Sequence, residues 1–568
     1  MPLASSDAGR GGETLNQWLM MDDPAINIED SNSEEHGERE GGGEPPSEGF
    51  GFATATILTV NMVVGAGVVG LPYAFYHAGA VISLISMFIA TVMSAMTMGY
   101  LVEVSAWAHY MVKHTAGREE RTGEEGEGGS RGRDDAIAEL PSDVTELDAG
   151  PSSSKHEARP AVDREVAMYE MSELCGIFLG GYGRKLFELC LLLYTIGSLW
   201  LYATVFGSSL SLVVPLPLGD RPTSIAWCLV RCDAVQDQAC SGACRWDNMT
   251  AACVAAPAVA SYCRQSYEVF LCFFALLMVA MACMDLAALK NVQFLLSSFA
   301  LSALLVMVVT CVVAVYTDGG NDAAYHRLPP TDMSGFGKLI TAALFSQICH
   351  QGVPTLMKTM RSGKQAKTVF RTALSFTLVL YSVLCCSTIY YFGPRVVPII
   401  TLNWEDYTGG AQAGMPIRWW APIISTTVLL FPVVSVSAAF PLNLLPLAET
   451  ILRLLPARWS LRIGEERARK LLKIFLSLLP ITLAAFVKDV AKILEFNGMF
   501  GFVIAFFAPC SLFLVARSTC RKRFGEQAAS TAYSSFPESS TFCVLLLLAF
   551  SVVLAAFTAR QVIMDYMS

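Results

Sequence analysis

From Phe50 onward, long apolar runs alternate with short polar connectors. A helix needs about 20 residues to cross the roughly 30 Å hydrocarbon core of a bilayer, and runs of that length predict membrane spans. We expect eleven such helices in an all-α integral membrane protein whose transmembrane domain covers residues 50–563. The runs are approximately residues 51–78, 80–111, 183–214, 267–285, 290–316, 336–358, 367–394, 418–451, 470–488, 490–516 and 541–563.

Composition supports this interpretation. Of the 568 residues, 53% are hydrophobic and 16% are charged, whereas soluble domains carry about 25% charged residues. A water-soluble enzyme is therefore disfavoured. The formal net charge of −9 and the lack of a long basic stripe disfavour a partner made of nucleic acid.

Polar segments interrupt the apolar pattern at several places. Residues 1–48 are acidic and predict a disordered tail, which could dock a cytosolic partner. Residues 113–165 predict a disordered insertion, and residues 166–182 predict an interfacial helix. A cysteine-rich loop covers residues 215–265, and residues 564–568 form a short C-terminus.

The distribution of Lys and Arg predicts the orientation of the spans, because short cytosolic loops are enriched in both. Basic residues gather after the sixth, eighth and tenth spans. We therefore expect the N-terminus and the insertion in the cytosol, and the cysteine-rich loop and the C-terminus on the extracytosolic side. The basic residues are Lys358, Arg361, Lys364, Lys367, Arg453, Arg458, Arg462, Arg467, Arg469, Lys470, Arg517, Arg521, Lys522 and Arg523.

The cysteine-rich loop gives an independent indication of its compartment. Six thiols in a short loop favour disulfides in an oxidising environment over a zinc site, since the paired C-x2-C spacing of a zinc ribbon is missing. Unpaired thiols are the remaining alternative. Asn248, Met249 and Thr250 form a glycosylation sequon. The candidate disulfide cysteines are Cys228, Cys232, Cys240, Cys244, Cys253 and Cys263.

The first predicted span contains a stretch that weakens a helix. Residues 61–72 read NMVVGAGVVGLP, with three glycines and a proline at bilayer depth. Freed backbone groups are tolerated in a membrane only where they face protein or a cavity. We expect a broken helix near residues 64–68, with N–H groups near Gly67 directed at an anionic group such as a carboxylate. Close packing of small residues against another helix is the alternative.

The sixth span has a matching interruption, in which residues 345–354 read FSQICHQGVP. Four intact spans separate the two interruptions. An inverted five-helix repeat places corresponding helices at positions one and six, with the binding site between them. The pair therefore predicts a secondary transporter rather than a receptor, whose spans need no matching breaks.

The same residues resemble a known family. Residues 61–79 carry the pattern N-x-x-x-G-x-G-x-x-x-L-P-x-A-F-x-x-A-G, which is similar to the start of the amino acid/auxin permease family. Weaker similarity continues through residues 169–207, 285–296, 345–358, 390–393 and 441–449. The resemblance implies a LeuT-like 5+5 inverted repeat with an eleventh helix. It also implies transport of free amino acids across the bilayer, coupled to protons or sodium.

Carried over residue by residue, the resemblance assigns a site. The backbone at Gly65, Ala66 and Gly67 would receive the substrate carboxylate. The break at Ile348, Cys349, His350 and Gly352 would receive the substrate ammonium. Asn61 matches a position that resembles a sodium ligand, with a partner hydroxyl from Ser435 or Ser437 in the eighth span, although Asn61 could instead serve helix packing.

His350 is the candidate for proton coupling, because histidine titrates near neutral pH. A structural histidine is the alternative. Ionisable residues such as Glu103 and Asp489 lie near span ends, where snorkelling or helix capping explains them. We expect no catalytic residues and no cofactor beyond a co-transported proton or sodium ion. An amino-acid sensor or channel is the alternative function. The expected membrane is the plasma membrane or a vacuolar or lysosomal one.

Overall fold

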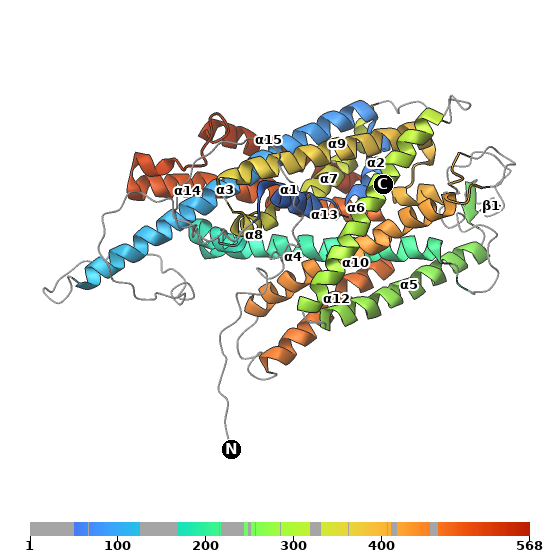
Figure 1. Ribbon diagram of the computed structural model, residues 1–568, viewed down its shortest axis with the longest axis horizontal. Helices are drawn as coiled ribbons and strands as arrows, with labels where there is room; N and C mark the ends of the chain where they lie inside the picture. Colours follow the sequence, from blue (N-terminus) through green and yellow to red (C-terminus); the bar gives the residue numbers. More distant parts are fainter. Residues whose placement is uncertain are drawn as a thin grey trace, which may run out of the picture.

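The computed structural model describes residues 50–65, 67–124, 169–214, 216, 244–247, 252–255, 257–283, 286–317, 331–361, 363–405, 407–410, 417–454 and 464–567. Within these residues the chain is almost entirely helical, which confirms the predicted all-α fold. Every one of the eleven predicted runs contains helix. Figure 1 shows long helices such as α3, α4 and α9 running in a similar direction, with α6 crossing them.

The helices correspond to the predicted runs in order. In sequence they are α1 (Phe52–Val63) with α2 (Gly67–Ala78), α3 (Ala80–Glu124), α4 (Met171–Val213), α5 (Pro257–Cys283), α6 (Leu286–Thr317), α7 (Phe336–Gln347) with α8 (Val353–Thr359), α9 (Ala366–Phe392), α10 (Ala421–Leu454), α12 (Glu465–Phe486), α13 (Val490–Phe502) with α14 (Ala508–Phe524), and α15 (Thr541–Met567). A π-helical turn at Val503–Phe507 joins α13 to α14. Short 3-10 turns precede α7 (Met333–Gly335) and α8 (His350–Gly352).

Length and composition qualify fewer helices as spans than the sequence predicts. Within the described ranges eight helices are long and apolar enough, or nine if the bent pair α1 and α2 counts as one span. The other two predicted spans are α7 with α8, which are short pieces, and α12. The first half of α12 carries four basic residues, which are Arg467, Arg469, Lys470 and Lys473.

The structure differs from the predicted elements at three places. Helix α3 continues to Glu124, beyond residue 113, where the sequence predicts the start of the insertion. The expected interfacial helix and third span form one element, α4, with a kink at Gly180, whose φ of 72° suits glycine. The cysteine-rich loop contains an antiparallel pair, β1 (Cys244–Asp247) and β2 (Ala252–Ala255). Residues 1–48 and 125–168 lie outside the described residues.

Aromatic packing ties α3 to α14. Tyr100 and Trp107 on α3 are both nearly fully buried. Their rings lie 4.8 Å and 5.1 Å from the ring of Phe513 on α14, a separation typical of favourable aromatic pairs. The indole N–H of Trp107 donates to the Ala528 carbonyl, so the polar edge of the ring is also satisfied.

Candidate functional site

The predicted break in the first span is present. Helix α1 ends at Val63, α2 begins at Gly67, and the two are bent by 63°. The N–H of Val64 closes the last turn of α1 on Val60. The phenol of Tyr381, on α9, donates to the carbonyl of Val63 at 3.3 Å and so satisfies one carbonyl that the break frees. Ala66 lies outside the described residues.

The predicted break in the sixth span is also present. Helix α7 ends at Gln347, and Ile348 has extended backbone angles. The 3-10 turn from His350 to Gly352 then leads into α8. The carbonyls that end α7 and the N–H groups that begin α8 therefore meet in the interior of the protein.

The four half-helices are tied in two pairs. At one end, the N–H of Asp332, before α7, donates to the carbonyl of Ala78, the last residue of α2. At the other end, Phe50 pairs with Met360 after α8, and the N–H of Arg361 donates to Phe50. Each half of the first span is thus linked to one half of the sixth. The N–H of Ser334 also donates to the Asp332 carboxylate, which lowers the pKa of that carboxyl.

Three glycines differ in what surrounds them. A Cβ at Gly67 would lie 2.8 Å from the Phe345 ring and 3.0 Å from the Ser346 backbone, so α2 and α7 touch there. A Cβ at Gly352 would clash with the end of Met62. A Cβ at Gly65 would meet nothing within 4 Å. Gly67 therefore serves close helix packing, whereas open space adjoins Gly65.

His350 lies in the interior, with no exposed surface. Its Nε2 lies 2.8 Å from the hydroxyl of Thr97 on α3. The same hydroxyl also lies within hydrogen-bond distance of the carbonyls of Met93 and Ser94. Which of Thr97 and His350 donates in this contact depends on the histidine tautomer, and Nδ1 has no hydrogen-bond partner in the described part of the chain.

The other members of the sixth-span break are also buried. The thiol of Cys349 lies 3.8 Å from the sulfur of Met98 on α3. Ile348 is 8% exposed, and its side chain abuts Gly501 on α13. Their backbone groups, rather than their side chains, are therefore what the break offers to a ligand.

The two halves of the predicted sodium site lie on helices with different neighbours. Asn61 is exposed on α1, and α1 packs on α8 and α9. Ser435 and Ser437 are buried on α10, which packs mainly on α4 and α6. The Ser437 hydroxyl donates to the Val433 carbonyl at 2.7 Å within its own helix.

Several polar residues of this region are not among the site residues that the sequence predicts. Thr97, Gln347, Thr377 and Tyr381 all face the breaks, and each is buried. Thr377 and Tyr381 are one turn apart on α9. Thr377 contacts Gln347 at the end of α7, and Tyr381 contacts Val63 at the end of α1. A polar residue inside an apolar span is the signal that could have identified them.

Span-end ionisable residues behave in two ways. Asp489 caps α13 by accepting from the N–H groups of Ala491 and Lys492, as the capping interpretation predicts. Glu103 is different, because it is fully buried and pairs with Lys367 at 2.7 Å. This carboxylate lies two turns from Thr97 along α3, beyond the break region.

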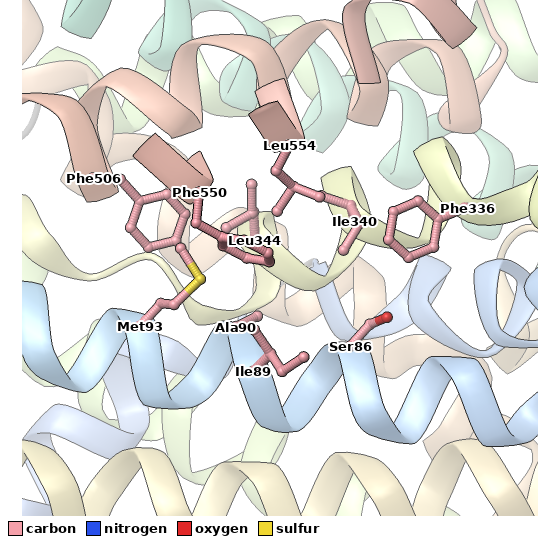
Figure 2. Close-up of a pocket in the computed structure, with 10 residues that line it drawn as sticks. All are labelled: Ser86, Ile89, Ala90, Met93, Phe336, Ile340, Leu344, Phe506, Phe550 and Leu554. Atoms are coloured by element: carbon pink, nitrogen blue, oxygen red, sulfur yellow. The ribbon is translucent and has the colours of Figure 1, made fainter. Parts of the chain in front are cut away.

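Two clefts lie near the breaks. One is a narrow cleft formed by α2, α7 and α13 with Pro398, and it includes Gly70, Tyr73 and Lys338. The other lies between α3, α7, the π-helical turn and α15. Figure 2 shows its lining, which is apolar apart from Ser86. The second cleft therefore offers almost nothing that would recognise a charged solute.

Fold and site together define a helical membrane protein whose first and sixth spans are broken and packed on each other, an arrangement typical of secondary transporters. The chain belongs to the transmembrane amino acid transporter protein family, whose model matches residues 48–119 and 153–558. The resemblance seen in the sequence is therefore confirmed.

Individual relatives are distant. The chain is 22% identical over 505 residues to the Transmembrane protein 104 homolog of Drosophila melanogaster, covering 85% of this chain and 92% of the relative. It is 23% identical over 509 residues to Transmembrane protein 104 of Homo sapiens, covering 87% and 93%. Among solved structures, MhsT in complex with L-phenylalanine aligns over 89% of this chain and 98% of its own, with 8% identity and a TM-score of 0.48.

Proposed function

We propose that this protein is a secondary active transporter that moves free amino acids across a membrane. The observation that carries the proposal is the pair of broken helices in a member of the amino acid transporter family. An amino acid zwitterion needs an anion site and a cation site close together. The N-terminus of α2 supplies N–H groups for a carboxylate, and the carbonyls at the end of α7 suit an ammonium.

The open space beside Gly65 supports this placement, because the substrate backbone must approach the protein backbone closely. Ala66 and Gly67 complete the proposed carboxylate site, and residues Ile348 to Gly352 complete the ammonium site. The linked pairs, α2 with α7 and α1 with α8, support alternating access. If each pair moves as one body, the two sides of the site open in turn.

We infer that protons drive the transport and that His350 carries them. Its Nδ1 has no hydrogen-bond partner in the described part of the chain, and in the tautomer whose proton lies on Nε2 this atom can take up a proton beside the break. The decisive experiment is uptake of a panel of labelled amino acids into proteoliposomes, with sodium and pH varied independently. Uptake that rises with an inward proton gradient and without sodium is the expected result.

His350→Gln is expected to remove most of the dependence of uptake on pH between about 5 and 8, because glutamine hydrogen-bonds without titrating. Exchange of amino acid across the membrane should persist. Thr558→Val on α15, another buried polar position, is the matched control and should keep the pH profile. Uptake that needs sodium at every pH, with an unchanged profile in His350→Gln, would instead favour Asn61 with Ser435 or Ser437 as a sodium site.

The same assay separates a transporter from an amino-acid sensor or channel. A sensor binds the amino acid without net flux, and a channel gives flux that no ion gradient can concentrate. Accumulation of the amino acid above its external concentration is therefore expected.

The acidic tail, residues 1–48, is proposed as a docking segment for a cytosolic partner. The membrane is proposed to be the plasma membrane or a vacuolar or lysosomal one.

We further propose that the loop at residues 215–265 is extracytosolic, disulfide-bonded and glycosylated at Asn248. Cys263 is disulfide-bonded, whereas Asn248, Cys228, Cys232 and Cys240 lie outside the described residues, as do the side chains of Cys244 and Cys253. Asn248→Gln is expected to abolish a glycosidase-sensitive shift in gel mobility. If an epitope inserted at residues 233–239 is labelled only after the membrane is permeabilised to give access to the cytosolic side, the extracytosolic placement of the loop is contradicted.

A further inference from the structure

The apolar cleft between α3, α7, the π-helical turn and α15 lies at the depth of bilayer hydrocarbon. Along α3 it extends from Ser86 to Met93 (Figure 2). These residues follow the start of the helix at Ala80 by roughly 9–20 Å along its axis, at 1.5 Å per residue. On α15 the cleft includes Phe550 and Leu554, near the middle of that span. Since the hydrocarbon core is about 30 Å thick, the cleft lies within it.

The cleft has a buried floor and an exposed mouth. At the floor, Leu344 on α7 and Phe506 in the π-helical turn are 1% and 0% exposed. At the mouth, Ile89 on α3 and Phe550 on α15 are 38% and 44% exposed. The same two helices expose further apolar residues, as surfaces that face lipid do, so the cleft opens onto the bilayer. These residues include Val81, Ile85, Phe88 and Val92 on α3 and Leu546 and Val553 on α15.

An empty cleft of this kind is unfavourable. Atoms that line a void lose the dispersion contacts they would make on that side, and the cost of a cavity rises with its volume. Water does not remove this cost, because apolar cavities stay dry and Ser86 is the only polar residue among the described residues that line the cleft. A hydrocarbon chain restores the contacts and needs no hydrogen bond.

We propose that this cleft binds one acyl chain of a membrane phospholipid. An acyl chain is narrow and flexible, so it can enter between Ile89 and Phe550 and reach the floor while its headgroup stays at the membrane surface. The π-helical turn that supplies Phe506 supports a functional role, because such turns are rare and are frequent at functional sites. One wall of the cleft is α7, through Ile340 and Leu344. The chain would therefore contact a half-helix that moves in the proposed function, but its binding does not depend on that function.

The test uses the full chain in proteoliposomes of phosphatidylcholine that carries a photoactivatable diazirine near the middle of one acyl chain. After irradiation, mass spectrometry locates the labelled residues. Lipid that merely surrounds the protein labels exposed residues such as Phe88 and Val553, but it cannot reach the buried floor. Labelling of Leu344 or Phe506 is therefore the expected result. Labelling confined to exposed residues would overturn the proposal.

Ala90→Trp fills the cleft, because Ala90 is a buried lining residue on α3. It is expected to reduce labelling of the floor at least about tenfold and to leave labelling of Phe88 unchanged. Val92→Trp, at an exposed position of the same helix, is the matched control and should change neither. If Ala90→Trp fails to fold, Leu554→Phe fills the cleft from α15 and should have the same effect.

Two further outcomes would contradict the proposal. One is unchanged labelling of the floor in a folded variant that fills the cleft, which would mean that the label reaches the floor by another route. The other is labelling of the floor by a photoactivatable sterol that phosphatidylcholine does not displace, which would assign the cleft to a sterol. Both outcomes are independent of amino-acid uptake, so they leave the proposed function to its own test.

Discussion

Gly65→Val is expected to abolish amino-acid uptake while the protein still folds and reaches the membrane. A Cβ at this position meets nothing within 4 Å, so the folded structure has room for a branched side chain. In the proposed mechanism this room receives the substrate carboxylate, which the valine methyl groups would displace. Uptake of labelled amino acid, normalised to surface-delivered protein, measures the effect, and a loss of at least about 100-fold is expected.

Gly67→Val is the matched comparison for this experiment. Its Cβ would enter the space of Phe345 and Ser346, so the substitution should reduce folding and delivery together with transport. Only Gly65→Val is expected to separate folding from function. Normal uptake by a well-delivered Gly65→Val protein would contradict the binding role of the first break.

The sequence alone predicts the breaks because they depend on local chemistry. Gly65, Gly67 and Pro72 weaken one helix, Gly352 and Pro354 weaken another, and the backbone groups that such residues free at bilayer depth must face protein or a cavity. The length of each apolar run likewise predicts the order of helices. The boundary at Lys488 and Asp489 is correct because a charged cap ends one apolar run and begins the next.

Side-chain partners could not be predicted in the same way. Tyr381 reaches Val63 across more than 300 positions of the chain, and nothing in the local pattern of α9 indicates which helix it faces. The pairing of His350 with Thr97 depends likewise on how α3 packs against the sixth span. The apolar pattern ends α3 too soon because residues 113–124 are polar, and polar residues can continue a helix beyond the membrane.

The local sequence pattern also gives no sign of the ion pair between Glu103 and Lys367. The carboxylate on α3 is fully buried, and the ammonium at the start of α9 is 11% exposed. Ser534 and Ser539, from the connector between α14 and α15, donate to the same carboxylate. Glu103 therefore joins two spans to a connector that the sequence places more than 400 residues away.

Glu103→Ala is expected to destabilise the protein by about 3–5 kcal/mol, because it leaves the Lys367 ammonium largely buried without its counter-ion. The unfolding midpoint in detergent should fall accordingly. Replacing both partners, as in Glu103→Leu with Lys367→Met, should restore much of the midpoint, since a buried ion pair often contributes little over apolar residues of similar volume.

An exposed pair gives the control for this prediction. Arg264 and Glu268 lie one turn apart on α5, with side chains 76% and 46% exposed, and such pairs contribute little to stability. Glu268→Gln should therefore leave the midpoint unchanged. If Glu103→Ala also leaves it unchanged, or if the double variant is less stable than the single one, the pair does not hold α3, α9 and the α14–α15 connector together. Destabilisation by Glu103→Ala that the double variant largely reverses would instead identify the unpaired ammonium as its cause.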